Sequence, residues 1–279
     1  MRDARNEEFY TPSGVRLRRY SAGEGLDWLL LPGGPGLGSE SLLGLAKAVE
    51  VPGNLWMVDL PGDGSNRDAP GAPADPYALW PDVLVEAAQA VAFPVLVAHS
   101  TGGMYALSVS GLEPLLCGFV LIESAPHAGW REKFGEFAAK NTSPQIRAAE
   151  QRYASNPSDE TVRELTLATA TWNVGAQSLP AAATMLERLP FNNAAVEWSG
   201  AHFDDVYEAT WWPAALPTLI ISGTADHVID QTIWVDPSYA GLHIHRTLID
   251  GGSHFPWLDR PEVVAAAINA FAMTLVARR

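Results

Sequence analysis

The chain has 279 residues, enough for one large α/β domain with an insertion or for two modest domains with sizeable cores. Hydrophobic residues make up 47% and charged residues 18%, as in ordinary soluble globular proteins. The formal net charge of −14 repels phosphate backbones and anionic membrane surfaces, so it argues against nucleic-acid binding and against membrane association.

Cysteine content and the apolar segments narrow the class of protein further. The single cysteine, Cys117, excludes an internal disulfide and argues against a cysteine-based zinc site. The segment 1–14 carries acids and has no apolar centre, so it does not look like a secretory signal. Apolar stretches such as 263–277 are too short to span a bilayer. We therefore expect a soluble, cytoplasmic protein; its oligomeric state is left open.

Short apolar runs alternate with helical patterns along much of the chain. The runs predict buried strands at 26–31, 55–60, 93–98, 118–123, 217–222 and 244–249. Amphipathic spacing predicts helices within 77–92, 102–112 and 261–276. Buried strands that alternate with helices are typical of an α/β fold, with a mostly parallel sheet and helices on both faces.

The alternation stops between residues 126 and 213. This region has mixed charge, many alanines and many aromatic residues, and it contains no convincing strand. It predicts a helical insertion into a core formed by residues 1–125 and 214–279. Helical insertions with aromatic faces often form lids over active sites, so we expect residues 126–213 to cover the site.

The stretch "AHSTGG" at 98–103 marks a strand that runs directly into a helix. Such a turn is strained and tolerates little bulk, which explains Ala98 before Ser100 and Gly102 and Gly103 after it. The pattern is typical of a nucleophile elbow, in which the serine hydroxyl is displayed at the start of the following helix. The alternative interpretation is a serine that only caps a helix.

A nucleophilic serine needs a base, and the base needs an orienting carboxylate. Asp226 follows the apolar run 217–222, and His254 lies in a glycine-rich loop after the last predicted strand. The chain order Ser100, Asp226, His254, each after a strand, is the order found in α/β-hydrolases. These three residues are the candidate catalytic residues.

The loop "PGGPG" at 32–36 follows the first predicted strand and is the candidate oxyanion loop. Its prolines have no N–H group, so Gly33, Gly34 and Gly36 are the possible donors to a developing oxyanion. Their missing side chains also let a substrate approach the backbone closely.

Taken together, these residues resemble the α/β-hydrolase superfamily. The family's motifs correspond to "GGPG" (33–36), "DLPGDGS" (59–65), "HSTGG" (99–103), "GTAD" (223–226) and "GSHFPWLDRPE" (252–262). The resemblance covers essentially the whole chain and implies that the insertion is the family's cap. It also implies that the N–H groups of Gly34 and Thr101 form the oxyanion hole. In the second motif, Asp63 stands where a histidine is common.

Within the superfamily, the "GGPG" loop is similar to that of proline iminopeptidases. Those enzymes usually have histidine before the loop, where this chain has Pro32, and Gly-Gly-Ser-Trp-Gly around the serine, where this chain has "AHSTG". Both departures weaken an assignment as an aminopeptidase.

The chemistry implied is acyl transfer without a metal or an organic cofactor. Ser100 attacks a carbonyl, His254 accepts its proton, and water then releases the acyl-enzyme. We expect a serine hydrolase of a small-molecule ester, lactone or amide. The alternatives are a proline iminopeptidase-like aminopeptidase, a non-catalytic ligand receptor, and a cofactor-free oxygenase or lyase on the same fold.

The stretch 197–212 of the insertion interleaves acidic and aromatic residues, so it could hold a substrate amine beside an apolar group. The alternative is an amphipathic helix with a solvated acidic face. The candidate substrate-binding residues are Gly33, Trp198, Phe203, Asp204 and Trp257.

Three further features are weighed against their simpler interpretations. Turn geometry points the side chains of His99 and Ser100 apart, so we expect His99 to pack within the core. Glu123 ends the run 118–123 at the same sheet edge and is an alternative acid to Asp226. His243 and His245 have no evident third ligand, so we expect a packing or surface role.

Overall fold

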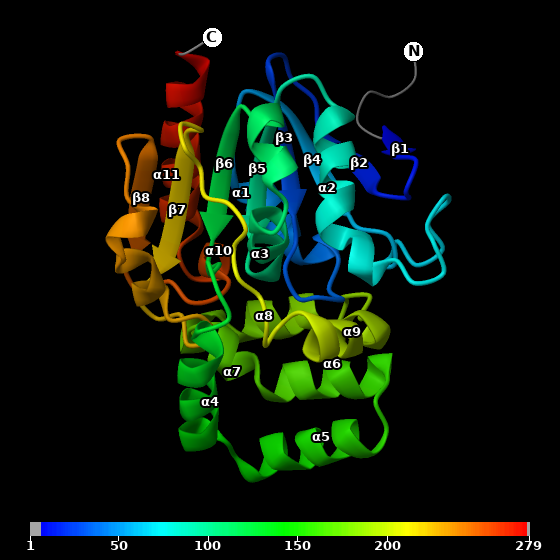
Figure 1. Ribbon diagram of the computed structural model, residues 1–279. Coiled ribbons are helices and arrows are strands. Elements are labelled where there is room, and N and C mark those ends of the chain that lie inside the picture. The colour runs from blue at the N-terminus through cyan, green and yellow to red at the C-terminus, as the bar shows by residue number, and fades with distance from the viewer. Residues whose placement is uncertain (1–6, 278–279) are drawn as a thin grey trace.

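The computed structural model describes residues 7–277 and consists of one eight-stranded sheet, helices on both of its faces, and a helical insertion (Figure 1). The strand order is β1-β2-β4-β3-β5-β6-β7-β8. The strands are β1 (Glu8–Tyr10), β2 (Arg16–Ser21), β3 (Leu26–Leu31), β4 (Gly53–Asp59), β5 (Pro94–His99), β6 (Gly118–Ile122), β7 (Thr218–Gly223) and β8 (Ile244–Ile249).

Six of these strands match the apolar runs, and the predicted mostly parallel α/β sheet is confirmed. Strands β3 to β8 are parallel, while β2 is antiparallel to both β1 and β4. The sequence analysis missed β1 and β2. Strand β2 reads RLRRYS, so its pattern is polar; Arg16 is nevertheless buried because Asp59 on β4 accepts its Nη2 hydrogen at 3.0 Å.

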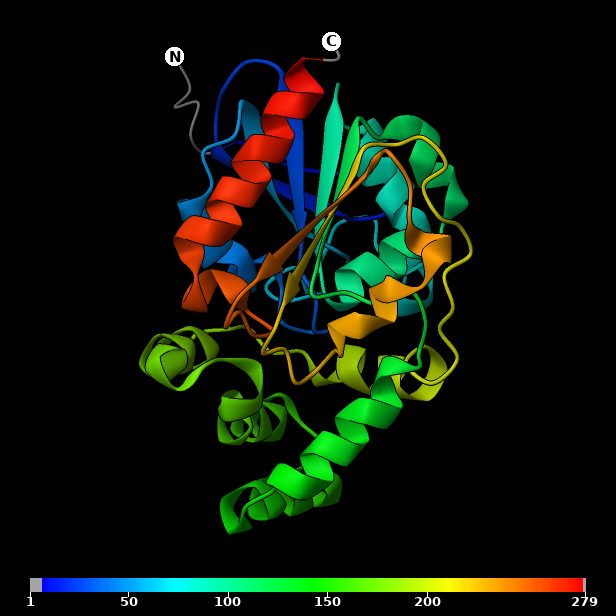
Figure 2. The same cartoon turned by 90° about the vertical axis from the view of Figure 1, so that its left-hand side faces the viewer.

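Four α-helices of the core cover the two faces of the sheet, as Figure 2 shows. Helices α2 (Trp80–Gln89) and α3 (Thr101–Leu107) cover one face, and α1 (Leu43–Ala48) and α11 (Pro261–Val276) cover the other. The predicted helix 102–112 is shorter than expected, since a 3₁₀ segment, Ser110–Leu115, containing Pro114 replaces its second half.

The central strands supply side chains alternately to two apolar cores. In β5, Leu96 and Ala98 join the core under α2 and α3, while Val95 and Val97 join the core under α1 and α11. Successive side chains of a strand point to opposite faces, so each face of the sheet is covered by its own apolar core and excludes water.

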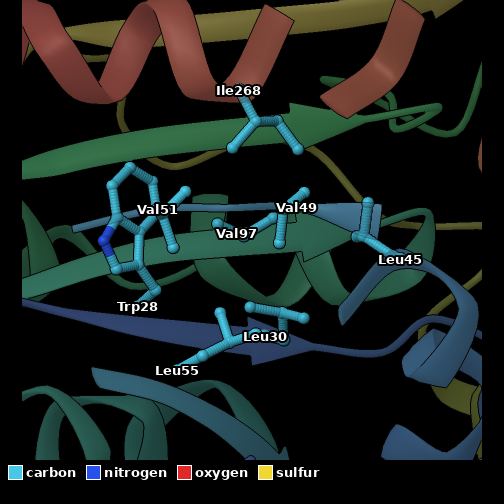
Figure 3. Close-up of a pocket in the computed structure, with 8 residues that line it drawn as sticks. All are labelled: Trp28, Leu30, Leu45, Val49, Val51, Leu55, Val97 and Ile268. Carbon is cyan, nitrogen blue, oxygen red and sulfur yellow. The ribbon is translucent and has the colours of Figure 1, made fainter. Parts of the chain in front are cut away.

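A small apolar pocket lies in the second core, between the sheet and helices α1 and α11 (Figure 3). It has no space for a water molecule, and the indole nitrogen of Trp28 already donates to the carbonyl of Pro52 at 2.9 Å. The pocket therefore reflects imperfect packing and is not a candidate ligand site.

The segment between β6 and β7 adds no strand to the sheet in the described part of the chain. Its helices are α4 (Trp130–Asn141), α5 (Pro144–Ser155), α6 (Asp159–Ala168), α7 (Ala170–Asn173), α8 (Leu179–Leu186) and α9 (Asn193–His202), and α10 (Pro256–Asp259) belongs to the core. In both ribbon views the insertion lies across the sheet edge where the parallel strands end (Figures 1 and 2). Ligand sites of open α/β sheets gather at this edge.

Contacts between backbone and side chains hold the insertion to the core. The N–H of Asn192 donates to the carbonyl of Gly36 at 2.9 Å, and Ser178 Oγ donates to the carbonyl of Leu258 at 3.1 Å. Arg67 forms an exposed ion pair with Asp159 at 2.8 Å. Residues from the middle of the insertion and from its second half are therefore tied to the core at the carboxyl edge of the sheet.

No helix in residues 7–277 is long and apolar enough to cross a membrane. The expectation about the N-terminal segment rests in part on residues 1–6, which lie outside the described residues.

Candidate active site

Ser100 lies between β5 and α3 with φ 50° and ψ −125°, a conformation that non-glycine residues rarely adopt. The turn is possible because the neighbouring residues have almost no side chain. A Cβ atom at Gly102 would lie 2.3 Å from the carbonyl oxygen of Pro32, and one at Gly103 would lie 2.4 Å from Ser124 Oγ. The predicted sharp turn is thus held between the candidate oxyanion loop and the end of β6, and its strain accords with a functional role.

Gly102→Ala is expected to destabilise the protein by about 1–3 kcal/mol, because the new methyl group would meet a backbone carbonyl that cannot rotate away. Thermal unfolding should show a Tm lower by roughly 2–10 °C. The matched control is Gly200→Ala in α9, where a Cβ atom meets nothing within 4 Å and the unfolded chain loses freedom. A Gly102→Ala Tm equal to that of the control would contradict the close approach.

The three candidate catalytic side chains form one hydrogen-bonded chain. Ser100 Oγ lies 3.0 Å from His254 Nε2, and His254 Nδ1 lies 3.1 Å from Asp226 Oδ2. All three side chains are buried. They come from three different strand ends, and the parallel sheet brings those ends to one edge. A serine, a histidine and a carboxylate in this order are suited to activating the serine hydroxyl.

Asp226 is built to stay ionised although it is almost fully buried. Its Oδ1 accepts the N–H groups of Val228 at 2.8 Å and Ile229 at 3.1 Å. Burial alone would raise the pKa of Asp226, but the neighbouring His254 and the hydrogen bonds to the carboxylate lower it below its ordinary value. The carboxylate can therefore stabilise a positive charge on the His254 ring.

His99 packs in the core, and it also supports the loop that carries His254. Its Nε2 lies 2.8 Å from the carbonyl oxygen of His254, and its ring lies 4.9 Å from the His254 ring and 4.8 Å from the Trp257 ring. Burial lowers the pKa of His99 to about 3, so the ring is neutral and Nε2 donates to that carbonyl. The sequence analysis gave His99 only a packing role.

The loop at 33–36 lies directly against the elbow. A Cβ atom at Gly33 would lie 2.6 Å from the Cβ of Ser100 and 3.2 Å from the nitrogen of Thr101. Thr101 opens α3, where the first N–H groups have no carbonyl partner within the helix, and its Oγ1 donates to the carbonyl of Gly34 at 3.4 Å. The N–H of Gly36 is occupied, because Asp63 Oδ1 accepts it at 3.0 Å.

Asp63 belongs to a buried charge cluster beneath this loop. Arg16 and Arg18 both donate to Asp59 Oδ2 at 3.0 Å, and Arg18 also donates to Glu40 at 2.9 Å. Two arginines thus face three carboxylates, which leaves one carboxylate uncompensated. Burial, strengthened by the charges of Asp59 and Glu40, raises the pKa of Asp63 to about 8, although backbone N–H groups oppose the shift. Asp63 is therefore protonated at neutral pH.

Asp63→Asn should change how stability depends on pH. The folded protein keeps a proton on Asp63 that the unfolded chain loses near its ordinary pKa of 3.8. The contribution of Asp63 to the free energy of unfolding is complete below about pH 3.8, falls steadily as the pH rises, and is fully lost above about pH 8. The Tm of the variant minus that of the native protein should therefore rise by roughly 5–10 °C between about pH 5 and pH 9. The exposed Asp68→Asn serves as control; a constant difference for Asp63→Asn would contradict the prediction.

A cavity of about 260 Å³ opens beside Ser100 and His254, between the core and the insertion. Leu37 and Phe255 line it from the core, and Val162, Phe191 and Val196 line it from the insertion. Its polar lining includes Thr166, Asn173 and Asp204. The cavity is thus mainly apolar with a few polar groups, as small-molecule sites usually are.

Of the five candidate substrate-binding residues, Asp204 lines this cavity. The other four are not among the lining residues. Trp198 packs against Tyr77, Phe203 packs against Tyr105, and Trp257 packs against His99. Gly33 packs against Ser100, so closely that a side chain at position 33 would meet the Cβ of Ser100. The sequence analysis did not single out Val162, Thr166, Asn173 and Val196, whose positions depend on how the insertion folds.

The amino-acid sequence and the structure both resemble those of known hydrolases. Pimeloyl-(acyl-carrier protein) methyl ester esterase from Xanthomonas campestris pv. campestris is 25% identical over 236 residues, which cover 79% of this chain and 85% of the relative. A proline iminopeptidase-related protein from Thermus thermophilus superposes with a TM-score of 0.73 at 21% identity, covering 99% of this chain and 100% of that one.

An esterase from Rhodococcus sp. superposes with a TM-score of 0.69 at 19% identity, and the match covers 97% of this chain and 99% of that one. At such identities the structural likeness shows the fold. The family model for the alpha/beta hydrolase family matches residues 28–267, which is most of the chain. The protein is therefore a member of the alpha/beta hydrolase family.

Proposed function

We propose that the protein is a serine hydrolase that cleaves a small ester or lactone through an acyl-enzyme on Ser100. The observation that carries this proposal is the hydrogen-bonded chain from Ser100 through His254 to Asp226, with distances of 3.0 and 3.1 Å, at the wall of an apolar cavity. The family's hydrolase chemistry and the esterase named among the relatives agree with it.

In the proposed reaction, Ser100 Oγ attacks the carbonyl carbon as His254 Nε2 takes the hydroxyl proton. Asp226 holds the imidazole through Nδ1 and stabilises its positive charge. The N–H groups of Gly34 and Thr101 are proposed to hold the oxyanion; one such donor contributes about 2.7–4 kcal/mol of transition-state stabilisation in comparable enzymes. His254 then protonates the leaving alkoxide and later activates the water that releases the acid.

The cavity favours an apolar acyl group over a substrate with a free amine. Asp204 is the acidic group that an amine would meet, but Ser199 Oγ donates to its Oδ1 at 2.7 Å and Arg131 lies 3.5 Å from its Oδ2. Burial also raises the pKa of Asp204, which weakens its hold on a cation. Asp204 is nevertheless the feature that keeps aminopeptidase activity as the second candidate.

Intact-mass labelling with a fluorophosphonate probe tests the proposal. One adduct is expected on the native protein and none on Ser100→Ala or His254→Ala. Hydrolysis of p-nitrophenyl esters, a γ-lactone and prolyl p-nitroanilide then ranks the substrate classes, with esters expected first. A folded native protein that takes no adduct, or an adduct that survives Ser100→Ala, would contradict a serine hydrolase and favour the receptor or lyase alternatives.

A further inference from the structure

Glu123 is a buried acid beside the proposed triad for which the mechanism above has no role. It follows β6 (Gly118–Ile122) directly, at the sheet edge that also carries Ser100 and Asp226. Its side chain is fully buried, and within the described residues neither carboxyl oxygen makes a well-formed hydrogen bond; the backbone N–H of Gly223 only opposes the rise of its pKa. An ionised carboxylate so poorly solvated is costly, so the residue needs a physical explanation.

The backbone at Glu123 is also unusual. Its φ is 45°, and Ser100 is the other non-glycine residue with a positive φ in the described chain. Left-handed backbone at a residue other than glycine costs about 1–3 kcal/mol and tends to persist at functional sites. The turn directs the chain after β6 past the end of β7: a Cβ atom at Gly223 would lie 3.0 Å from Glu123 Oε1.

The charges around Glu123 show which acid holds a proton. The carboxyl group of Asp226, which follows β7, lies within hydrogen-bonding reach of Glu123, and Asp259 on α10 adds a second negative charge. On its other side Asp226 contacts His254. Burial and then Asp226 raise the pKa of Glu123 well above its ordinary value, while the pKa of Asp226 is lowered. The opposite directions of the two shifts favour a shared proton on Glu123 over one on Asp226.

We propose that Glu123 is a positioning residue of the triad: it remains a neutral carboxylic acid and donates its hydrogen to the Asp226 carboxylate. If Glu123 and Asp226 were both ionised, neither could donate a hydrogen bond to the other, and the Glu123 oxygens would have no side-chain partner. One proton on Glu123 turns the same contact into a charge-assisted hydrogen bond, which satisfies a buried oxygen and steadies the ionised Asp226. This inference rests on the proposed function, because it deepens the role of Asp226.

Two substitutions test whether Glu123 acts as a neutral hydrogen-bond donor, as a negative charge, or only by filling space. Glu123→Gln keeps a neutral donor of the same size, whereas Glu123→Leu fills the space without a donor. The rate of Ser100 phosphonylation by the fluorophosphonate and kcat/KM for a p-nitrophenyl ester are measured from pH 5 to 9. Thermal unfolding confirms that each variant folds, and Asp250→Asn, exposed at the same edge, is the control.

The Gln variant should keep kcat/KM within about threefold, with the acid limb of its pH profile unmoved. The Leu variant should lose roughly 10–100-fold, since a hydrogen bond to a charged group is removed. Its acid limb should move to higher pH, because an Asp226 without this donor holds the proton on His254 more strongly. A Leu variant that matches the native protein would show that Glu123 is not a positioning residue.

The protonation state of Glu123 can also be measured directly, without an activity assay. Because Asp63 is also protonated at neutral pH, the infrared spectra are recorded in an Asp63→Asn background. They should contain the carbonyl band of a buried protonated carboxyl group, which disappears when Glu123→Gln is added and remains when Asp250→Asn is added. No such band, or a Gln variant whose acid limb moves to lower pH, would show that Glu123 is ionised and overturn the inference. A native protein that the probe does not label, yet that shows the band, would instead contradict the proposed function.

Discussion

Ser100→Ala is expected to lower kcat for a p-nitrophenyl ester by a factor on the order of 10⁶, judged from single losses of the nucleophile in comparable enzymes. Without the hydroxyl no acyl-enzyme forms, and His254 Nε2 loses the partner that lies 3.0 Å away. The residual rate should come from the oxyanion donors and from binding alone, so KM should change little. Steady-state kinetics with a sensitive fluorogenic ester measures both parameters.

The matched control for this variant is Ser108→Ala. Ser108 also lies at an end of α3, where its Oγ donates to the carbonyl of Met104 at 2.9 Å, away from the cavity. It should keep native kinetics within about twofold. If Ser100→Ala retained more than about a hundredth of the native kcat while remaining folded, the acyl-enzyme mechanism would have to be abandoned and His254 considered as a base acting directly on substrate.

The core of the fold could be read from the sequence because the central strands are buried on both faces. Uninterrupted runs such as LDWLLL at 26–31 can hardly be anything but a central strand, and β3 has these bounds. The edge strand β2 gave no such signal, since Arg16 is buried through an ion pair with Asp59 across the sheet. An interaction between distant residues leaves no local pattern.

The positions of the three candidate catalytic residues were likewise easier to predict than the residues that line the cavity. Ser100, Asp226 and His254 each follow a strand, so the parallel topology alone brings them to one edge. The cavity lining depends on how helices of the insertion pack: Thr166 and Asn173 reach it because α6 and α7 cross the sheet edge. The sequence showed Asp63 only as a replacement for a common histidine, and its hydrogen bond to Gly36 in the candidate oxyanion loop depends on the tertiary structure.

Asp226→Asn should lower kcat by a factor on the order of 10⁴. The N–H groups of Val228 and Ile229 donate to Oδ1, so an asparagine would keep its carbonyl oxygen there and turn its NH₂ toward His254. That NH₂ donates where Oδ2 now accepts at 3.1 Å, and it would favour the tautomer that carries hydrogen on Nε2. Such an imidazole cannot take the proton of Ser100.

The pH dependence distinguishes this explanation from simple loss of structure. With the carboxylate gone, kcat should recover in part at alkaline pH, where hydroxide can substitute for the missing base, while Tm stays near the native value. Gln231→Ala is the control, because it removes a weaker donor to the same carboxylate oxygen, at 3.3 Å, and should cost less than about tenfold. Equal losses in the two variants would mean that Asp226 acts by holding its loop and not by fixing the tautomer of His254.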